Sequence, residues 1–187
     1  MNRRNFAQLV GTTGLSLFSP LNMYSSEKSL TKYKFNLAYA PHLGMFRHHA
    51  GDDPIDQLNF IADQGFTAFE DNEMRNRSVY LQEKISSTMV KRGLRMGVFV
   101  AHKIYWQKPN LASGNQEFRE EFLDYIKKSI SVAKRVNAKW ITVVPGHVDP
   151  RKKFAYQTIN VIETLKQASA LLEPHNIVMV LEPLNFR

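Results

Sequence analysis

Five short apolar runs alternate with four helical patterns along the chain, and this alternation restricts the fold more than any other feature of the sequence. The runs cover 33–40, 66–69, 94–101, 139–144 and 177–181. The segments between them repeat apolar residues every three or four positions, as amphipathic helices do. Strands that alternate strictly with helices pair in parallel through right-handed crossovers. The sequence therefore predicts either an open, doubly wound parallel sheet or part of a barrel of about eight strands.

The ends of the predicted helices carry recognisable signals. Asp53 followed by Pro54 is a strong helix start, because proline at the first helical position has no N–H to leave unpaired. Ser113 and Gln116 resemble a capping box for the third helix, and Asn137 is expected to end that helix in a left-handed conformation. The fourth helix is expected to bury Ile162, Leu165, Ala168 and Leu172.

The run 177–181 is expected to be the most deeply buried strand. All its residues are apolar, which suits a parallel strand covered on both faces. Glu182 follows directly, and a carboxylate in that position is costly to bury unless it is paired or binds a metal ion. Pro183 cannot donate to a sheet, so strand pairing is expected to stop there. The run is thus predicted to place Glu182 at the carboxyl end of the sheet as a functional carboxylate.

Polar residues follow every predicted strand, which favours the barrel over the open sheet. The open nucleotide-binding sheet is weakened by the lack of a G-x-G-x-x-G fingerprint and of a phosphate-binding P-loop. In a barrel the carboxyl ends of all strands share one rim, where the active site lies. The residues expected at that rim are His42, Glu70, His102, His147 and Glu182.

Each candidate residue also has a structural explanation. Glu70 either contacts substrate or simply begins a loop. His102 and His147 either bind substrate or metal or are histidines held by hydrogen bonds, and His147 follows a Pro-Gly turn that brings the backbone close to a neighbour. Trp106 either forms an aromatic wall over a small polar ligand or anchors its loop.

Composition narrows the chemistry. The net charge is +8, from 25 basic and 17 acidic residues, but the basic residues are scattered in short pairs. Solvated helix faces explain this excess, whereas nucleic-acid binding would require a basic stripe. With no cysteine, thiolate metal sites and thiol nucleophiles are excluded. A metal ion would have to be held by His, Asp or Glu, which suits Mg, Mn or Zn.

Residues 1–32 read as a segment separate from the domain that begins at residue 33. Arg3 and Arg4 precede a mildly apolar stretch, in the order of a twin-arginine export signal. The alternative is a disordered N-terminus on a cytoplasmic protein. No stretch reaches the roughly 18 apolar residues that span a bilayer.

The stretch 177–185, which ends in Leu-Glu-Pro-Leu-Asn, resembles the fifth strand of the xylose isomerase-like TIM barrel superfamily. Within it, the chain is most similar to hydroxypyruvate isomerases and related sugar epimerases. The supporting segments are 65–70, 117–119 and 133–138, and the resemblance covers about 33–187. It implies a parallel α/β fold of the TIM-barrel type that is incomplete, with about five of the eight strands present.

The resemblance implies a metal-dependent isomerase or epimerase for a small sugar or hydroxy-carbonyl compound. A divalent ion polarises the substrate oxygens in such enzymes, and two glutamates exchange a proton with carbon through an enediolate. Glu182 matches the glutamate that binds the metal and acts in proton transfer. The residues implied to line the substrate pocket are Glu70, His102, Trp106, His147 and Asn185.

The family's other metal ligands come from strands six to eight, which are absent from this sequence. We therefore expect a fragment or truncated product that is inactive alone, with open sheet edges that favour self-association. An endonuclease IV-like zinc phosphodiesterase is an alternative on the same barrel, although that branch has a histidine where this chain has Glu70. A non-catalytic binding or association module is the third hypothesis.

Overall fold

The computed structural model describes residues 33–184. The predicted export signal or disordered segment, 1–32, and the predicted pocket residue Asn185 lie outside the described residues.

The described residues alternate helices and strands as the sequence predicts. Three short 3₁₀ helices lie between them: η1 (Met74–Asn76), η2 (Leu111–Ser113) and η3 (Glu173–His175). The main elements are, in order, α2 (Arg47–Ala50), α3 (Pro54–Asp63), β1 (Ala68–Phe69), α4 (Val79–Arg92), β2 (Arg95–Met96), α5 (Gln116–Val136), β3 (Trp140–Val143), α6 (Phe154–Leu172) and β4 (Val178–Leu181).

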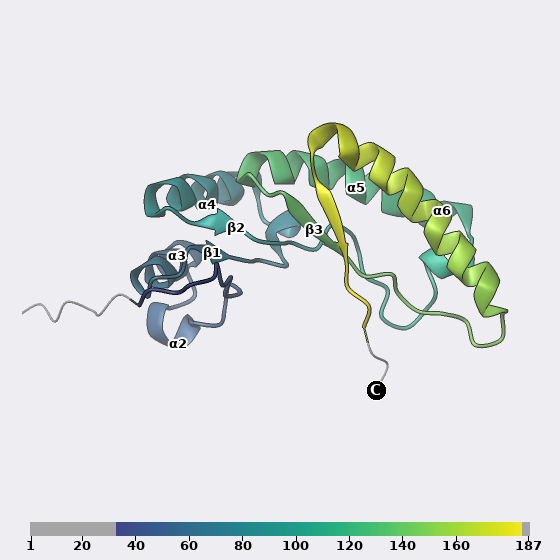
Figure 1. Cartoon of the computed structure of the whole chain (residues 1–187), viewed down its shortest axis with the longest axis horizontal. Coiled ribbons are helices and arrows are strands. Elements are labelled where there is room, and N and C mark those ends of the chain that lie inside the picture. Colours follow the sequence, from purple (N-terminus) through teal and green to yellow (C-terminus); the bar gives the residue numbers. More distant parts are fainter. Residues whose placement is uncertain (1–32, 185–187) are drawn as a thin grey trace, which may run out of the picture.

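Strand segments pair in parallel with their neighbours in chain order. β1 pairs with β2, and β3 pairs with β4. Two isolated parallel bridges extend the series, one between His42 and Glu70 and one between Val100 and Thr142. Helices α4, α5 and α6 follow one another along one side of the strands (Figure 1). This is the arrangement of successive units of a β/α barrel, and residues 33–184 form a partial, open one.

The predicted first strand over 33–40 is wrong, because pairing begins only after it. The Glu70 N–H donates to the Pro41 carbonyl at 3.0 Å, and the Leu43 N–H donates to the Glu70 carbonyl at 3.0 Å. Residues 33–39 are exposed and have no regular strand structure. Phe35 instead stacks on Phe66, with ring centroids 4.6 Å apart, so the aromatic character of this run serves side-chain contacts rather than a sheet.

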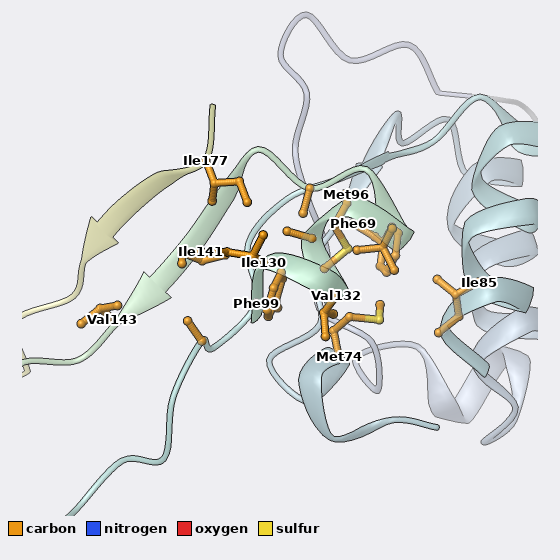
Figure 2. Packing of buried hydrophobic residues seen from close by; sticks show 14 of the residues in the cluster. Phe69, Met74, Ile85, Met96, Phe99, Ile130, Val132, Ile141, Val143 and Ile177 are labelled. Atoms are coloured by element: carbon orange, nitrogen blue, oxygen red, sulfur yellow. The ribbon is translucent and has the colours of Figure 1, made fainter. Parts of the chain in front are cut away.

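The core lies between the helices and the strand segments. Phe69, Phe99 and Ile141 are fully buried on the strand side, and they belong to one apolar cluster with Ile85 of α4 and Ile130 of α5 (Figure 2). Burying each such side chain stabilises the fold by about 1.5–3 kcal/mol. Packing of these apolar residues therefore holds each helix on its strand.

Most helix ends form as predicted. The Asp53 side chain accepts a hydrogen bond from the Ile55 N–H at 2.6 Å, and Asn137 ends α5 with φ of 51°. The capping box is wrong: the Asn115 side chain caps α5 by accepting from the N–H groups of residues 117 and 118. Ser113 instead donates its hydroxyl to the Asn110 carbonyl at 2.5 Å, which closes η2.

The prediction that 177–181 is covered on both faces is also wrong. Ile177 is buried, whereas Val178 and Leu181 are 54% and 46% exposed. β4 pairs with β3 along one edge, and within residues 33–184 no strand pairs with its other edge. The same open side leaves Ile162 of α6 exposed, against expectation, while Ala168 and Leu172 are buried. Apolar composition alone did not reveal that this strand and helix lie at the margin of the described fold.

Candidate functional site

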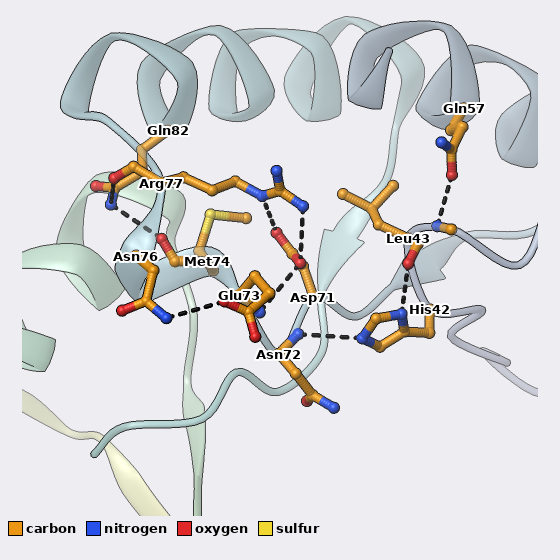
Figure 3. A network of polar contacts seen from close by, with 11 residues as sticks. His42, Leu43, Gln57, Asp71, Asn72, Glu73, Met74, Asn76, Arg77 and Gln82 are labelled. Atoms are coloured by element: carbon orange, nitrogen blue, oxygen red, sulfur yellow. Dashed lines mark hydrogen bonds and ion pairs between the residues drawn. The ribbon is translucent and has the colours of Figure 1, made fainter. Parts of the chain in front are cut away.

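A buried ion pair shapes the loop that follows β1. The Asp71 carboxylate is buried and accepts two hydrogen bonds from Arg77, from Nε at 2.5 Å and from Nη2 at 3.1 Å (Figure 3). Gln82 of α4 donates from Nε2 to the carbonyls of Met74 and Arg77 at 3.0 and 2.9 Å. A bidentate pair and two main-chain anchors hold the loop 71–77 in one conformation. The loop therefore presents its remaining side chains at the carboxyl end of the strands.

His102 directly follows the apolar run 94–101, and the main chain holds its side chain at both ring nitrogens. Its Nδ1 bonds the Lys103 carbonyl at 2.8 Å, and its Nε2 accepts from the Val144 N–H at 3.1 Å. The ring is buried, and this burial lowers the pKa of His102 to about 4, while the bond to Lys103 opposes the shift and the charge of Arg75 adds to it. His102 is thus a neutral imidazole that joins two strand ends.

Glu182 lies at the carboxyl end of β4, where its N–H donates to the Val143 carbonyl at 3.0 Å. Its side chain is exposed, so the expected buried charge is not found. It opens on a cavity of about 450 Å³, within the usual size range of small-molecule sites. The other polar residues that line this cavity are Asn72, Glu73, Arg75, Asn76, His102, Lys103 and Trp106.

A second cavity, of about 580 Å³, adjoins the first and contains His147. Trp106 lines both cavities and is 62% exposed. The turn that leads to His147 needs glycine: Gly146 has φ of 86°, and a Cβ there would collide with Oδ1 of Asn110. The sequence prediction that this turn approaches a neighbour closely is therefore confirmed.

The loop that carries Trp106 is tied to α5 through the preceding residue. The Tyr105 hydroxyl donates to the Glu121 carboxylate at 2.6 Å, and this bond raises the pKa of Tyr105. The Tyr105 and Phe118 rings also lie 5.4 Å apart. Trp106 is thus an exposed side chain on an anchored loop at the mouth of both cavities.

The structure brings Glu182, His102 and Trp106 to one cavity and His147 to the adjoining one. Glu70 lines neither cavity, and its main chain pairs with Pro41 and Leu43. Two residues that the sequence did not single out, Glu73 and Arg75, do line the cavity of Glu182. The sequence feature that could have identified them is their position just after the predicted strand 66–69, since loops at the carboxyl end of parallel strands form the active site.

The carboxylates of this cavity do not form a metal centre on their own. Within residues 33–184 no group of three His, Asp or Glu side chains is placed to hold a metal ion. Glu182 and Glu73 are the acidic residues that line the cavity, and the ring nitrogens of His102 are occupied by the main chain. The described residues therefore do not fit a complete divalent-metal site.

None of the helices within residues 33–184 has the length and the apolar character of a membrane-spanning segment.

Several solved structures share this fold. D-psicose 3-epimerase with D-tagatose from Clostridium cellulolyticum H10 superposes with a TM-score of 0.62 at 13% identity, over 80% of this chain and 53% of that one. An AP endonuclease of family 2 from Brucella melitensis gives 0.60 at 19% identity, over 78% and 55%. The IolI protein with a bound zinc atom gives 0.53 at 14% identity, over 68% and 45%.

The chain spans about half the length of these structures. They include a sugar epimerase and an AP endonuclease, and the IolI protein binds a zinc atom. A comparison with curated proteins finds no match. The predicted parallel fold of the TIM-barrel type is confirmed, as a partial barrel. The family model described as xylose isomerase-like TIM barrel matches residues 58–187, and the chain belongs to that family.

Proposed function

We propose that this chain forms part of the active site of an isomerase or epimerase that acts on a small sugar or hydroxy-carbonyl compound. The observation that carries the proposal is the position of Glu182. Its carboxylate stands at the carboxyl end of a parallel strand and opens on a cavity shared with His102 and Trp106. Residues at that end of barrel strands perform the chemistry in barrel enzymes.

Glu182 is the proton acceptor in this proposal. Its carboxylate takes the proton from the carbon beside the substrate carbonyl, and the electrons of the broken C–H bond move into an enediolate. A proton returned to the same carbon from the opposite face gives the epimer, and one returned to the neighbouring carbon gives the isomer. Trp106 covers the reacting compound, and His102 holds two strand ends at a fixed spacing below it.

A metal ion has no assigned step here. The zinc-bound neighbour supports metal use in this family, but residues 33–184 contain no group of three ligands. Further ligands and the second proton-transfer residue would come from outside the described residues.

The test is exchange of a carbon-bound proton with solvent. The protein purified from its native host, with any chain that accompanies it, is incubated in D₂O with hydroxypyruvate or a ketohexose and Mn²⁺. We expect deuterium at the carbon beside the carbonyl, and loss of exchange by at least about 100-fold in Glu182→Gln. Exchange that is unchanged in this variant would overturn the proposal.

A zinc phosphodiesterase is the second candidate, and the similarity to the AP endonuclease is the observation that favours it. The hydrogen bonds of His102 weigh against it, because both ring nitrogens are occupied by the main chain and neither is available to zinc. Incision of a duplex with an abasic site, without the deuterium exchange described above, would favour this candidate.

We also propose self-association through the exposed edge of β4. Val178, Val180 and Leu181 are exposed there, and an unpaired strand edge is a template for pairing. Sedimentation of the chain at micromolar concentration should give a species larger than 21.6 kDa, and Val180→Lys should shift it toward the monomer. A monomer at all concentrations would contradict this proposal.

A further inference from the structure

Arg75 is a cation without an anionic partner at the cavity of Glu182. It lines that cavity from the loop after β1. Within residues 33–184 no carboxylate lies within ion-pairing distance of its guanidinium, whereas Arg77, two positions later, is paired with buried Asp71. The Nε of Arg75 is buried and has no hydrogen-bond partner. A buried N–H without a partner destabilises the fold, so this arrangement requires an explanation.

The surroundings of Arg75 hold the guanidinium in place without pairing its N–H groups. Its central carbon lies 4.6 Å from the centroid of the Tyr125 ring, a cation–π contact with a residue of α5. Stacking occupies one face of the planar group, and within residues 33–184 the Nη groups at its end make no hydrogen bond. Those donors match the oxygens of a carboxylate or a phosphate. The fold thus orients Arg75 and leaves its hydrogen bonding incomplete.

The other charges of the cavity are distributed so that an anion is tolerated beside Arg75. Glu73 accepts a hydrogen bond from the Asn76 amide at 2.9 Å, which occupies one of its two carboxylate oxygens. Lys103 is a second cation on the cavity wall, 3.8 Å from the Glu121 carboxylate. Glu182 is the second acidic residue of the lining. Two cations and two carboxylates suit a ligand with a negatively charged end and an uncharged, reacting end.

We propose that Arg75 binds an oxyanion on the substrate, so that the site takes hydroxy-carbonyl compounds with a carboxylate or phosphate group rather than neutral sugars. The oxyanion accepts hydrogen bonds from the Arg75 guanidinium, and the hydroxy-carbonyl end reaches Glu182. This inference rests on the proposed function for the assignment of a substrate. Binding of the oxyanion itself does not depend on turnover. Arg75 is in this view a specificity-determining residue.

The experiment follows the Nε–Hε signal of Arg75 by ¹⁵N–¹H NMR in the full chain. The signal is assigned from its loss in Arg75→Lys. The probes are inorganic phosphate, hydroxypyruvate and, as the neutral compound, dihydroxyacetone, all at constant ionic strength. We expect a saturable downfield shift of the Arg75 proton with phosphate or hydroxypyruvate, and none with dihydroxyacetone. The oxyanion that saturates at the lower concentration identifies the substrate's charged group.

Arg75→Gln should weaken oxyanion binding by at least about tenfold, followed at the backbone amides of residues 71–77. Arg95→Gln is the matched control, because Arg95 is exposed on β2 outside the cavity, and its variant should bind as the native chain does. Amide dispersion in the same spectra reports whether each variant is folded. A shift that never saturates, or equal binding by Arg75→Gln, would overturn the inference.

The two proposals fail separately. Glu182→Gln should lose deuterium exchange and retain oxyanion binding. If exchange depends on Glu182 but no oxyanion binds at Arg75, only the proposed role of Arg75 is contradicted. If an oxyanion binds at Arg75 but no exchange depends on Glu182, only the proposed isomerase or epimerase activity is contradicted.

Discussion

The Nε2 atom of His102 accepts a hydrogen bond from the Val144 main-chain N–H at 3.1 Å, which joins the ends of two adjacent strand segments. The bond requires a neutral ring with the proton on Nδ1, where the Lys103 carbonyl accepts it at 2.8 Å. Protonation would place a second N–H at Nε2, directly opposite the N–H of Val144. The link at the base of the cavity therefore depends on pH.

Acid should weaken the fold through His102. Its pKa is about 4 in the folded chain against an ordinary value of 6.5, so the unfolded chain binds the proton first as pH falls. The contribution of His102 is present above pH 6.5 and is lost between pH 6.5 and about 4, amounting to about 3 kcal/mol. Urea unfolding at several pH values should show that the advantage of the native chain over His102→Gln shrinks across this range. The exposed His175→Gln is the control, and a gap that is constant with pH would contradict the prediction.

Removal of the buried carboxylate beside β1 should destabilise the chain. Asp71→Asn leaves Arg77 partly buried without its anion, and we expect a loss of about 3 kcal/mol in the free energy of unfolding. The matched control is Asp63→Asn, which breaks an exposed pair with Arg92 and should cost less than about 1 kcal/mol. Equal losses in the two variants, measured by urea unfolding, would show that the pair at the loop has no special role.

The cap of α5 can be tested at one position. Asn115→Ala removes the acceptor for the N–H groups of Glu117 and Phe118 and should cost about 1 kcal/mol. Asn115→Ser keeps an acceptor at the cap and should cost a few tenths of a kcal/mol at most. The melting temperatures of the two variants give this ranking, and a serine variant as unstable as the alanine variant would argue against the cap.

Gly146 should tolerate no side chain. Gly146→Ala combines a positive φ of 86° with a collision against Asn110, so the loss should exceed the roughly 1 kcal/mol of a strained φ alone. Gly93→Ala has a positive φ of 66° with open space around the new Cβ, which isolates the backbone cost. Calorimetry of both variants measures the difference, and similar losses would mean that Asn110 moves aside freely.

Local signals predicted much of this fold. The apolar runs and helical spacings were sufficient for parallel pairing in chain order, because period and alternation follow from backbone geometry. Asp53 and Asn137 were found correctly, since caps depend on a few neighbouring residues. The cap of α5 moved from Ser113 to Asn115 because Ser113 closes a 3₁₀ turn whose existence the local pattern did not indicate.

The sequence alone was enough to identify Glu182 as a carboxylate at a strand end, because an apolar run and a proline mark that end in any context. Only the tertiary structure decided its neighbours. His102 links two strand ends, and Glu70 does not line the cavity. Arg75 does line it, and within residues 33–184 it has no anionic partner. The exposure of β4 was also decided by the tertiary structure. Burial, ion pairing and ring stacking join residues far apart in the chain, and no local pattern of residue types encodes those distances.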